Sequence, residues 1–181
     1  MNLKLFSICF IISSFIGIFF FILGFLLLPI DQFSPNLKPS FTKIFCTNFE
    51  IHFHTILLSI ISFGFFSFIF LFEQFFYLGF TFHSLMSKTS LITAFSYFAG
   101  HGIVEIINMF LTASIGLFVA VYIISLIRRK EFTRDSLVIL GKNILALLVF
   151  DFSLLLIAAL LETYLSPLLV DKSSIIKLSQ H

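Results

Sequence analysis

Long apolar runs alternate with short polar stretches along the chain and leave room for five membrane crossings. A helix needs roughly 20 apolar residues to cross a hydrocarbon core about 30 Å thick. The pattern therefore predicts an all-α membrane protein that forms one polytopic domain over residues 1–181. The predicted spanning helices cover about 5–28, 51–72, 75–99, 103–127 and 143–165.

The first run, Leu5–Leu28, contains no charged residue and follows Lys4. Because it is too long for a signal-peptide core and lacks a small-x-small cleavage site, we expect an uncleaved helix. Ser13, Gly17 and Gly24 recur in it at helical spacing. Small residues let helices approach closely, so these three predict a face that packs against another helix.

The third run is irregular. Phe75–Met86 reaches only about 18 Å as a helix, which is less than the thickness of the hydrocarbon core. Ser87–Ser90 interrupts the apolar pattern, and Leu91–Ala99 resumes it. A broken helix is tolerated at membrane depth where protein or a wet cavity covers it, so we interpret the run as one crossing in two pieces. A re-entrant hairpin is the alternative.

Positive charge predicts the orientation, because loops rich in Lys and Arg face the cytoplasm. Residues 128–142 form the most cationic connection. Counting back from it through single crossings places the amino terminus inside, in agreement with Lys4, whereas a hairpin in the third run would place it outside. The sequence therefore predicts five crossings with the amino terminus inside and the carboxyl terminus outside.

The composition is that of a membrane protein. The chain is 59% hydrophobic and 11% charged, whereas soluble domains carry about 25% charged residues. We therefore expect membrane lipid as its main surroundings. The net charge of +2 is too small to suggest a nucleic-acid partner. Cys9 and Cys46 lack the spacing of a disulfide or metal site.

Ionisable residues inside spans are candidates for function. Glu105 lies one turn inside the start of the fourth predicted helix, and Glu162 lies one turn inside the end of the fifth. Because these helices are antiparallel neighbours, both carboxylates fall at a similar depth near the outer face. His101, between Gly100 and Gly102, lies at the same end. We therefore expect a cluster of His101, Glu105 and Glu162.

Two stripes predict how the fourth and fifth helices face each other. Asp151 and Glu162 are eleven residues apart, about three turns, and so share one face of the fifth helix. Asp151 lies deeper, and the sequence shows no cationic partner at its depth. We expect this face to meet the polar-to-small stripe of the fourth helix. That stripe consists of Glu105, Asn108, Thr112, Gly116 and Ala120.

Other chemistry is weakly supported. His52 and His54 open the predicted second helix and point to different sides of it, so a shared metal site is not expected. No nucleophile elbow, paired-Asp intramembrane protease pattern, His-Glu-x-x-His motif or P-loop is present. The chain is therefore expected to be non-enzymatic and to need no cofactor, and any energised process would require a partner subunit.

Three roles fit the expected His101, Glu105 and Glu162 cluster. In the favoured structural role, the two acids are neutral or hydrogen-bonded and cap backbone breaks at 100–102 and 166–167. A proton or ion relay is the second role, because carboxylates in apolar surroundings exchange protons near neutrality. A metal site is the third, because His101 and Glu105 share a face if the helix begins before His101.

Three motifs carry a family resemblance: Gly-His-Gly-Ile-Val-Glu at 100–105, the stretch at 113–116, and Ala-Ala-Leu-Leu-Glu-Thr-Tyr-Leu-Ser-Pro at 158–167. With them the sequence resembles the stage II sporulation protein M (SpoIIM) family of bacterial membrane proteins. A weaker likeness lies in Phe-Phe-Tyr-Leu-Gly at 75–79. Gly100 departs from the proline that the family often has there, and Glu73-Gln74 departs from its Asn-Gly.

The resemblance implies a multi-pass protein of the bacterial cell membrane without known enzymatic activity. It implies a scaffold or accessory role, either in circular-bacteriocin export and immunity or in envelope remodelling during sporulation engulfment. The expected partners are other membrane proteins, such as an ABC-type ATPase and permease or a hydrolase complex, and a homo-oligomer is left open. The alternative function is a small proton- or ion-coupled transporter component that uses Glu105 and Glu162.

Overall fold

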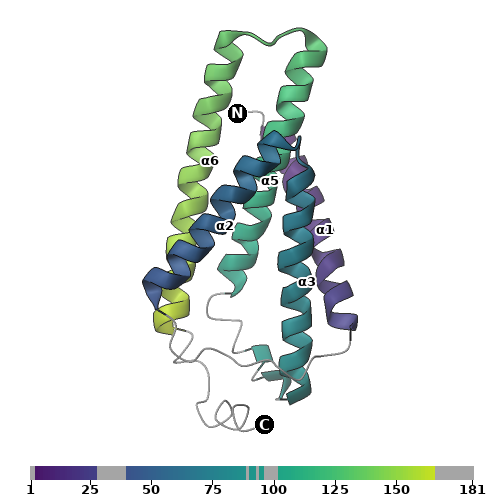
Figure 1. The fold of residues 1–181 in the computed structure, drawn as a ribbon, viewed down its shortest axis with the longest axis vertical. Coiled ribbons are helices and arrows are strands. Elements are labelled where there is room, and N and C mark those ends of the chain that lie inside the picture. The colour runs from purple at the N-terminus through teal and green to yellow at the C-terminus, as the bar shows by residue number, and fades with distance from the viewer. Residues whose placement is uncertain (1–2, 28–39, 89, 93, 96–101, 166–181) are drawn as a thin grey trace.

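The computed structural model describes residues 3–27, 40–88, 90–92, 94–95 and 102–165. Every regular element in these ranges is helical, and five helices are long and apolar enough to cross a membrane. The elements are α1 (Leu3–Leu26), α2 (Phe41–Ile61), α3 (Phe65–Lys88), α5 (Gly102–Arg129), α6 (Arg134–Leu160) and the short π-helical turn η1 (Leu161–Leu165) that continues α6 (Figure 1).

Helix α5 is the centre of the bundle. Helices α1, α2, α3 and α6 all pack against it, and around it α1 packs on α3, α3 on α2, and α2 on α6. In the most apolar part of α5, 67% of the residues are buried, compared with 22–33% in the other four spans. The small residues of α5 explain this position, because they let several neighbours approach one helix closely.

The contact between α1 and α3 depends on glycine. Gly24 lies against the backbone of Phe76, and Gly79 lies against the backbone of Phe21, so a side chain at either glycine would collide with the opposite main chain. Ser13, Gly17 and Gly24 are all buried. This confirms the close-packing face that the sequence predicts on the first helix.

A tight turn joins α2 to α3. Gly64 has a φ of +88°, a conformation that glycine adopts without steric cost, and its amide donates to the Ser59 carbonyl oxygen at 2.7 Å. The Ser62 hydroxyl accepts from the Phe66 amide at 2.9 Å and so satisfies one free donor at the start of α3. The chain therefore reverses within three residues.

The helix starts and the connections define the two ends of the bundle. The start of α1, the turn at 62–64 and the loop between α5 and α6 lie toward one end, and the starts of α2 and α5 lie toward the other (Figure 1). Thr133 and Ser136 cap α6 reciprocally, with each side chain accepting from the other's backbone amide at 3.3 and 3.0 Å. This cap begins α6 at Arg134.

The predicted boundaries of three helices are wrong. The predicted second span, 51–72, is divided by the turn at 62–64, so α2 begins at Phe41 and residues 65–74 belong to α3. Residues 75–88 therefore continue a helix that begins at Phe65, and no new crossing begins at residue 75. Most of the expected second piece, 91–99, lies outside the described residues. The last span begins at Arg134, earlier than the predicted residue 143, because the cationic connection is itself largely helical.

Candidate functional site

Four polar side chains from three helices meet in the interior of the bundle. His52 comes from α2, Asn108 and Thr112 come from α5, and Asp151 comes from α6. His52 is 3% exposed and the other three are fully buried. We call these four residues the central polar cluster. Buried polar groups at this depth are costly unless they are hydrogen-bonded, so their contacts decide what the cluster does.

Thr112 lies at the centre of the hydrogen-bond network. Its hydroxyl lies 2.7 Å from Oδ1 of Asp151, 2.6 Å from Nδ1 of His52 and 3.0 Å from the carbonyl oxygen of Asn108. With the His52 proton on Nδ1, the imidazole donates to the Thr112 oxygen, and the Thr112 hydroxyl donates to Asp151. This arrangement uses one donor and one acceptor at each step and connects α2, α5 and α6 in series.

Asp151 is the acceptor on which the cluster converges. With the Asn108 amide nitrogen turned toward α6, Asn108 donates to Oδ1 of Asp151 at 3.1 Å and to its carbonyl oxygen at 3.2 Å. The second carboxylate oxygen, Oδ2, lies 3.5 Å from Nδ1 of His52 and has no hydrogen-bond partner among the described residues. His52 is therefore the one ionisable group of the cluster that can neutralise the Asp151 charge.

Helical spacing places these groups. Asn108 and Thr112 are four residues apart and so lie one above the other on the same face of α5. One turn further along this face, Gly116 leaves room for a buried hydrogen bond of 2.8 Å between Ser67 of α3 and Ser59 of α2. Asn108, Thr112, Gly116 and Ala120 are all buried. Burial does not distinguish the predicted stripe, because every residue from 108 to 120 is buried; the contacts of Asn108 and Thr112 with Asp151 agree with the expected meeting of the fourth and fifth helices.

The two predicted acids also come together. Glu105 lies in the first turn of α5 and Glu162 lies in η1, and their carboxylates are close enough for the charges to act on each other. Both side chains are partly exposed, and Gly102 beside them is buried. Gly100 and His101 lie outside the described residues. The expected contribution of His101 to the three-residue cluster therefore stays a prediction. Within the described ranges, no group of His, Cys, Asp and Glu has the arrangement of a metal site.

The sequence misses one member of the central polar cluster. The sequence predicts His52 at the mouth of a helix, but α2 begins eleven residues earlier, at Phe41, and His52 lies in the interior. Asp151 therefore has an ionisable neighbour, His52, that the sequence does not place at its depth. The opposite directions of His52 and His54 are confirmed, because His52 is buried and His54 is exposed. The spacing of the two histidines was the signal in the sequence that could have revealed His52. Residues two apart on a helix point to different sides, so one of the two histidines had to face the bundle.

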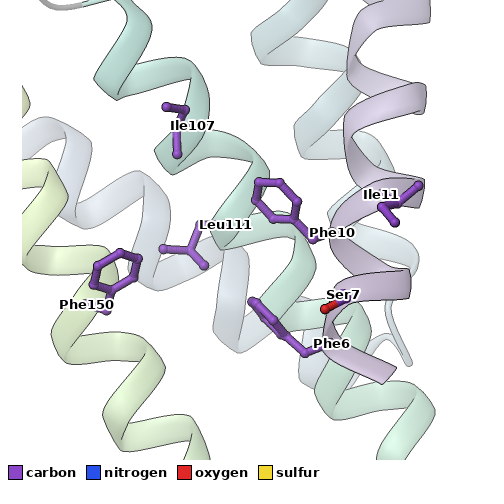
Figure 2. A pocket seen from close by; sticks show the side chains of 7 residues that line it. All are labelled: Phe6, Ser7, Phe10, Ile11, Ile107, Leu111 and Phe150. Carbon is purple, nitrogen blue, oxygen red and sulfur yellow. The ribbon is translucent and has the colours of Figure 1, made fainter. Parts of the chain in front are cut away.

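An apolar pocket of about 360 Å³ lies between α1 and α6 over the outer surface of α5 (Figure 2). The only polar side chain that lines it is Ser7, whose hydroxyl donates to the Leu3 carbonyl oxygen at 2.9 Å. The surface of the pocket therefore suits hydrocarbon. The residues that line it are Phe6, Ser7, Phe10, Ile11, Ile107, Leu111 and Phe150.

The fold agrees with a comparison of the sequence with known families. The family model described as Stage II sporulation protein M (SpoIIM) matches residues 6–167. This match includes the five spanning helices almost completely, as well as both groups of polar residues. Neither a curated protein nor a solved structure matches the chain.

Proposed function

Because the chain belongs to the SpoIIM family, we propose that it is a non-enzymatic accessory or scaffold subunit of a complex in the bacterial cell membrane. The SpoIIM family is not a known enzyme family, and the five spanning helices fit a multi-pass membrane protein. The proposed work of the chain is to present a fixed helical surface to partner membrane proteins.

The carrying observation is the central polar cluster. Thr112 connects His52 to Asp151 through hydrogen bonds of 2.6 and 2.7 Å. Asn108 donates to Oδ1 and to the backbone carbonyl oxygen of Asp151. All four side chains are at most 3% exposed. These groups bind one another in the interior of the bundle, where an unpaired polar side chain would be costly. Their arrangement supports a device that holds α2, α5 and α6 together.

Two processes suit such a subunit: circular-bacteriocin export and immunity, or envelope remodelling during engulfment. The genes beside the coding sequence indicate which of the two processes should be assayed. A short precursor peptide and an ATPase gene favour the first process, and sporulation hydrolase genes favour the second. Deletion of the gene should then reduce bacteriocin release and tolerance, or arrest engulfment. Normal growth, release, tolerance and engulfment in the deletion strain would contradict the proposal.

A proton-coupled component is the second candidate, and the proximity of Glu105 and Glu162 is the observation that favours it. Two neighbouring carboxylates in partly apolar surroundings can share and exchange a proton. The test is proton flux into liposomes that contain the purified protein and a pH-sensitive dye. Flux above that of empty liposomes, and its loss in the E105Q/E162Q variant, would establish this candidate. The scaffold proposal expects flux equal to that of empty liposomes.

A further inference from the structure

The end of α5 projects beyond the helices that surround its middle. Every residue from 108 to 120 is buried, whereas from 121 to 129 only Leu126 is buried. Phe118 still lies against Phe6 of α1, with the ring centroids 5.8 Å apart. In Figure 1 the α5–α6 hairpin continues past the start of α1 and past the turn between α2 and α3. In the part of the chain that the structure describes, the final turns of α5 therefore have an open side.

A pocket of about 480 Å³ opens on this side, and every residue that lines it belongs to α5. The residues follow one face of the helix at steps of three and four, and so they form a stripe roughly 12 Å long. One end of the stripe is cationic and the other end is apolar. We call it the arginine pocket, and the residues that line it are Val121, Ile124, Ser125, Arg128 and Arg129.

The polar groups of the arginine pocket have no partner among the described residues. Arg128 and Arg129 are exposed, and neither forms an ion pair with a described acid. Ser114 and Ser153 each donate to the carbonyl oxygen four residues earlier, but the Ser125 hydroxyl makes no such hydrogen bond. A guanidinium group binds phosphate oxygens through two parallel hydrogen bonds. The pocket therefore presents a set of donors that suits a phosphate.

The position of the pocket along α5 suits a lipid. Helix α5 has 28 residues and so is about 42 Å long, whereas the hydrocarbon core is about 30 Å thick. Arg128 and Arg129 therefore reach the headgroup region when the apolar part of α5 lies in the core. Val121 and Ile124 are 41% and 40% exposed and lie one to two turns nearer the core. A phospholipid has the same order, with a phosphate at the membrane surface and acyl chains below it.

Charge and size narrow the class of ligand. Residues 128–142 contain five cations and two acids, and basic segments beside membrane helices attract anionic headgroups. A stable protein partner would cover about 800 Å² of this chain, which is far more than one short stripe on a single helix offers. The arginine pocket therefore fits one anionic headgroup better than it fits a protein surface.

We propose that the arginine pocket binds an anionic phospholipid. Arg128 and Arg129 hold the phosphate, the Ser125 hydroxyl donates to one of its oxygens, and Val121 and Ile124 lie against the first carbons of an acyl chain. In the predicted orientation this lipid belongs to the cytoplasmic leaflet. The proposal rests on the end of α5 alone and does not depend on the accessory role.

Native mass spectrometry of the purified full-length protein tests the site. The probes are anionic dioleoylphosphatidylglycerol and zwitterionic dioleoylphosphatidylcholine at equal concentration, and the wild type should prefer the anionic lipid. The R128Q/R129Q variant should lower its affinity for that lipid about tenfold. The matched control R134Q/K142Q removes the same charge from the same connection but lies outside the pocket, and it should lower the affinity less than about twofold. Circular dichroism in detergent shows that both variants are folded.

Two further measurements distinguish other ligands. An excess of glycerol 3-phosphate should leave the anionic lipid bound, because it lacks the acyl chain that contacts Val121 and Ile124. A benzophenone side chain in place of Ile124 should form no adduct with another protein in native membranes. The proposal is overturned by equal binding of the two lipids, by equal losses in the two double variants, by displacement with glycerol 3-phosphate, or by a protein adduct at position 124.

Discussion

Asp151 is the residue on which most of the buried polar contacts converge. Thr112 and Asn108 donate to its Oδ1, and the imidazole of His52 lies 3.5 Å from its Oδ2. Removal of this carboxylate takes away the side-chain acceptor that Thr112 and Asn108 share in an apolar interior, and it leaves them only the backbone carbonyl oxygens of residues 108 and 151. The stability of the bundle should therefore respond more strongly to Asp151 than to other polar residues of α6.

Replacement of Asp151 by leucine should lower the free energy of unfolding by about 1–2 kcal/mol, because Thr112 and Asn108 lose the carboxylate acceptor that connects α5 to α6. SDS titration followed by circular dichroism measures this change. Ser153 is the matched control on α6, because it is exposed and its hydroxyl donates to its own helix at Val149. S153A should change the free energy by less than about 0.5 kcal/mol. Equal effects of the two substitutions would mean that the central polar cluster does not stabilise the fold.

The sequence predicts part of this cluster because helical spacing is a local property. Asn108, Thr112 and Asp151 lie on predicted faces because the interior of the fourth and fifth helices is correctly assigned. His52 escapes prediction because its depth depends on where α2 begins, and its contact with Thr112 joins residues sixty positions apart. Periodicity predicts which face a residue occupies, but not which residue of another helix faces it.

At the scale of elements, small residues determine how closely the helices approach. Gly116 on α5 faces Ser59 of α2 and Ser67 of α3, and the two serines are hydrogen-bonded directly over it. Gly141 on α6 has no atom of another helix within 4 Å of the position that a Cβ would occupy. The chain therefore offers two helical glycines in opposite environments.

The G116A substitution should destabilise the fold by about 1–3 kcal/mol, because the new methyl group must displace both serines. G141A should be neutral or stabilise by up to about 1 kcal/mol, since alanine is the better helix former. Thermal unfolding of the two variants in the same detergent compares them directly. A G116A variant as stable as G141A would contradict the close approach of α2, α3 and α5.

The boundaries of α2 and α3 show where apolar patterning fails. The turn at 62–64 contains no charge and no proline, so the apolar run from 51 to 72 reads as one helix. The chain direction reverses at Gly64, which has a positive φ, and at Ser62, whose hydroxyl caps α3. A single glycine and a single serine are weak signals of a turn in an apolar sequence. Glu73, which reads as the end of a span, lies inside α3 because the helix begins only at Phe65.

At the scale of the whole molecule, the sequence correctly predicts an all-α protein with five candidate spanning helices, because long apolar runs are a strong signal. The orientation in the membrane stays a prediction. It rests on the basic residues at the end of α5 and in the loop that follows, among them Arg128, Arg129 and Lys130.

Single cysteines test the orientation in protoplasts, in a background without Cys9 and Cys46. Phe63 and Phe132, both exposed, lie in the two connections at the predicted cytoplasmic end, and Ser40 precedes α2 at the opposite end. A membrane-impermeant maleimide should label S40C in intact protoplasts, and it should label F63C and F132C only after lysis. Labelling of F132C in intact protoplasts would invert the predicted topology.

The central claim is that the intramembrane acids act within a structural scaffold and carry no protons, and complementation by the E105Q/E162Q variant tests it most directly. The variant is expressed in the deletion strain at the membrane level of the wild type, and bacteriocin release and tolerance or engulfment is measured, as the neighbouring genes indicate. Glutamine preserves shape and hydrogen bonding but cannot ionise, so activity close to that of the wild type is expected. Loss of activity in a variant that is folded and present at the normal level would contradict the scaffold role.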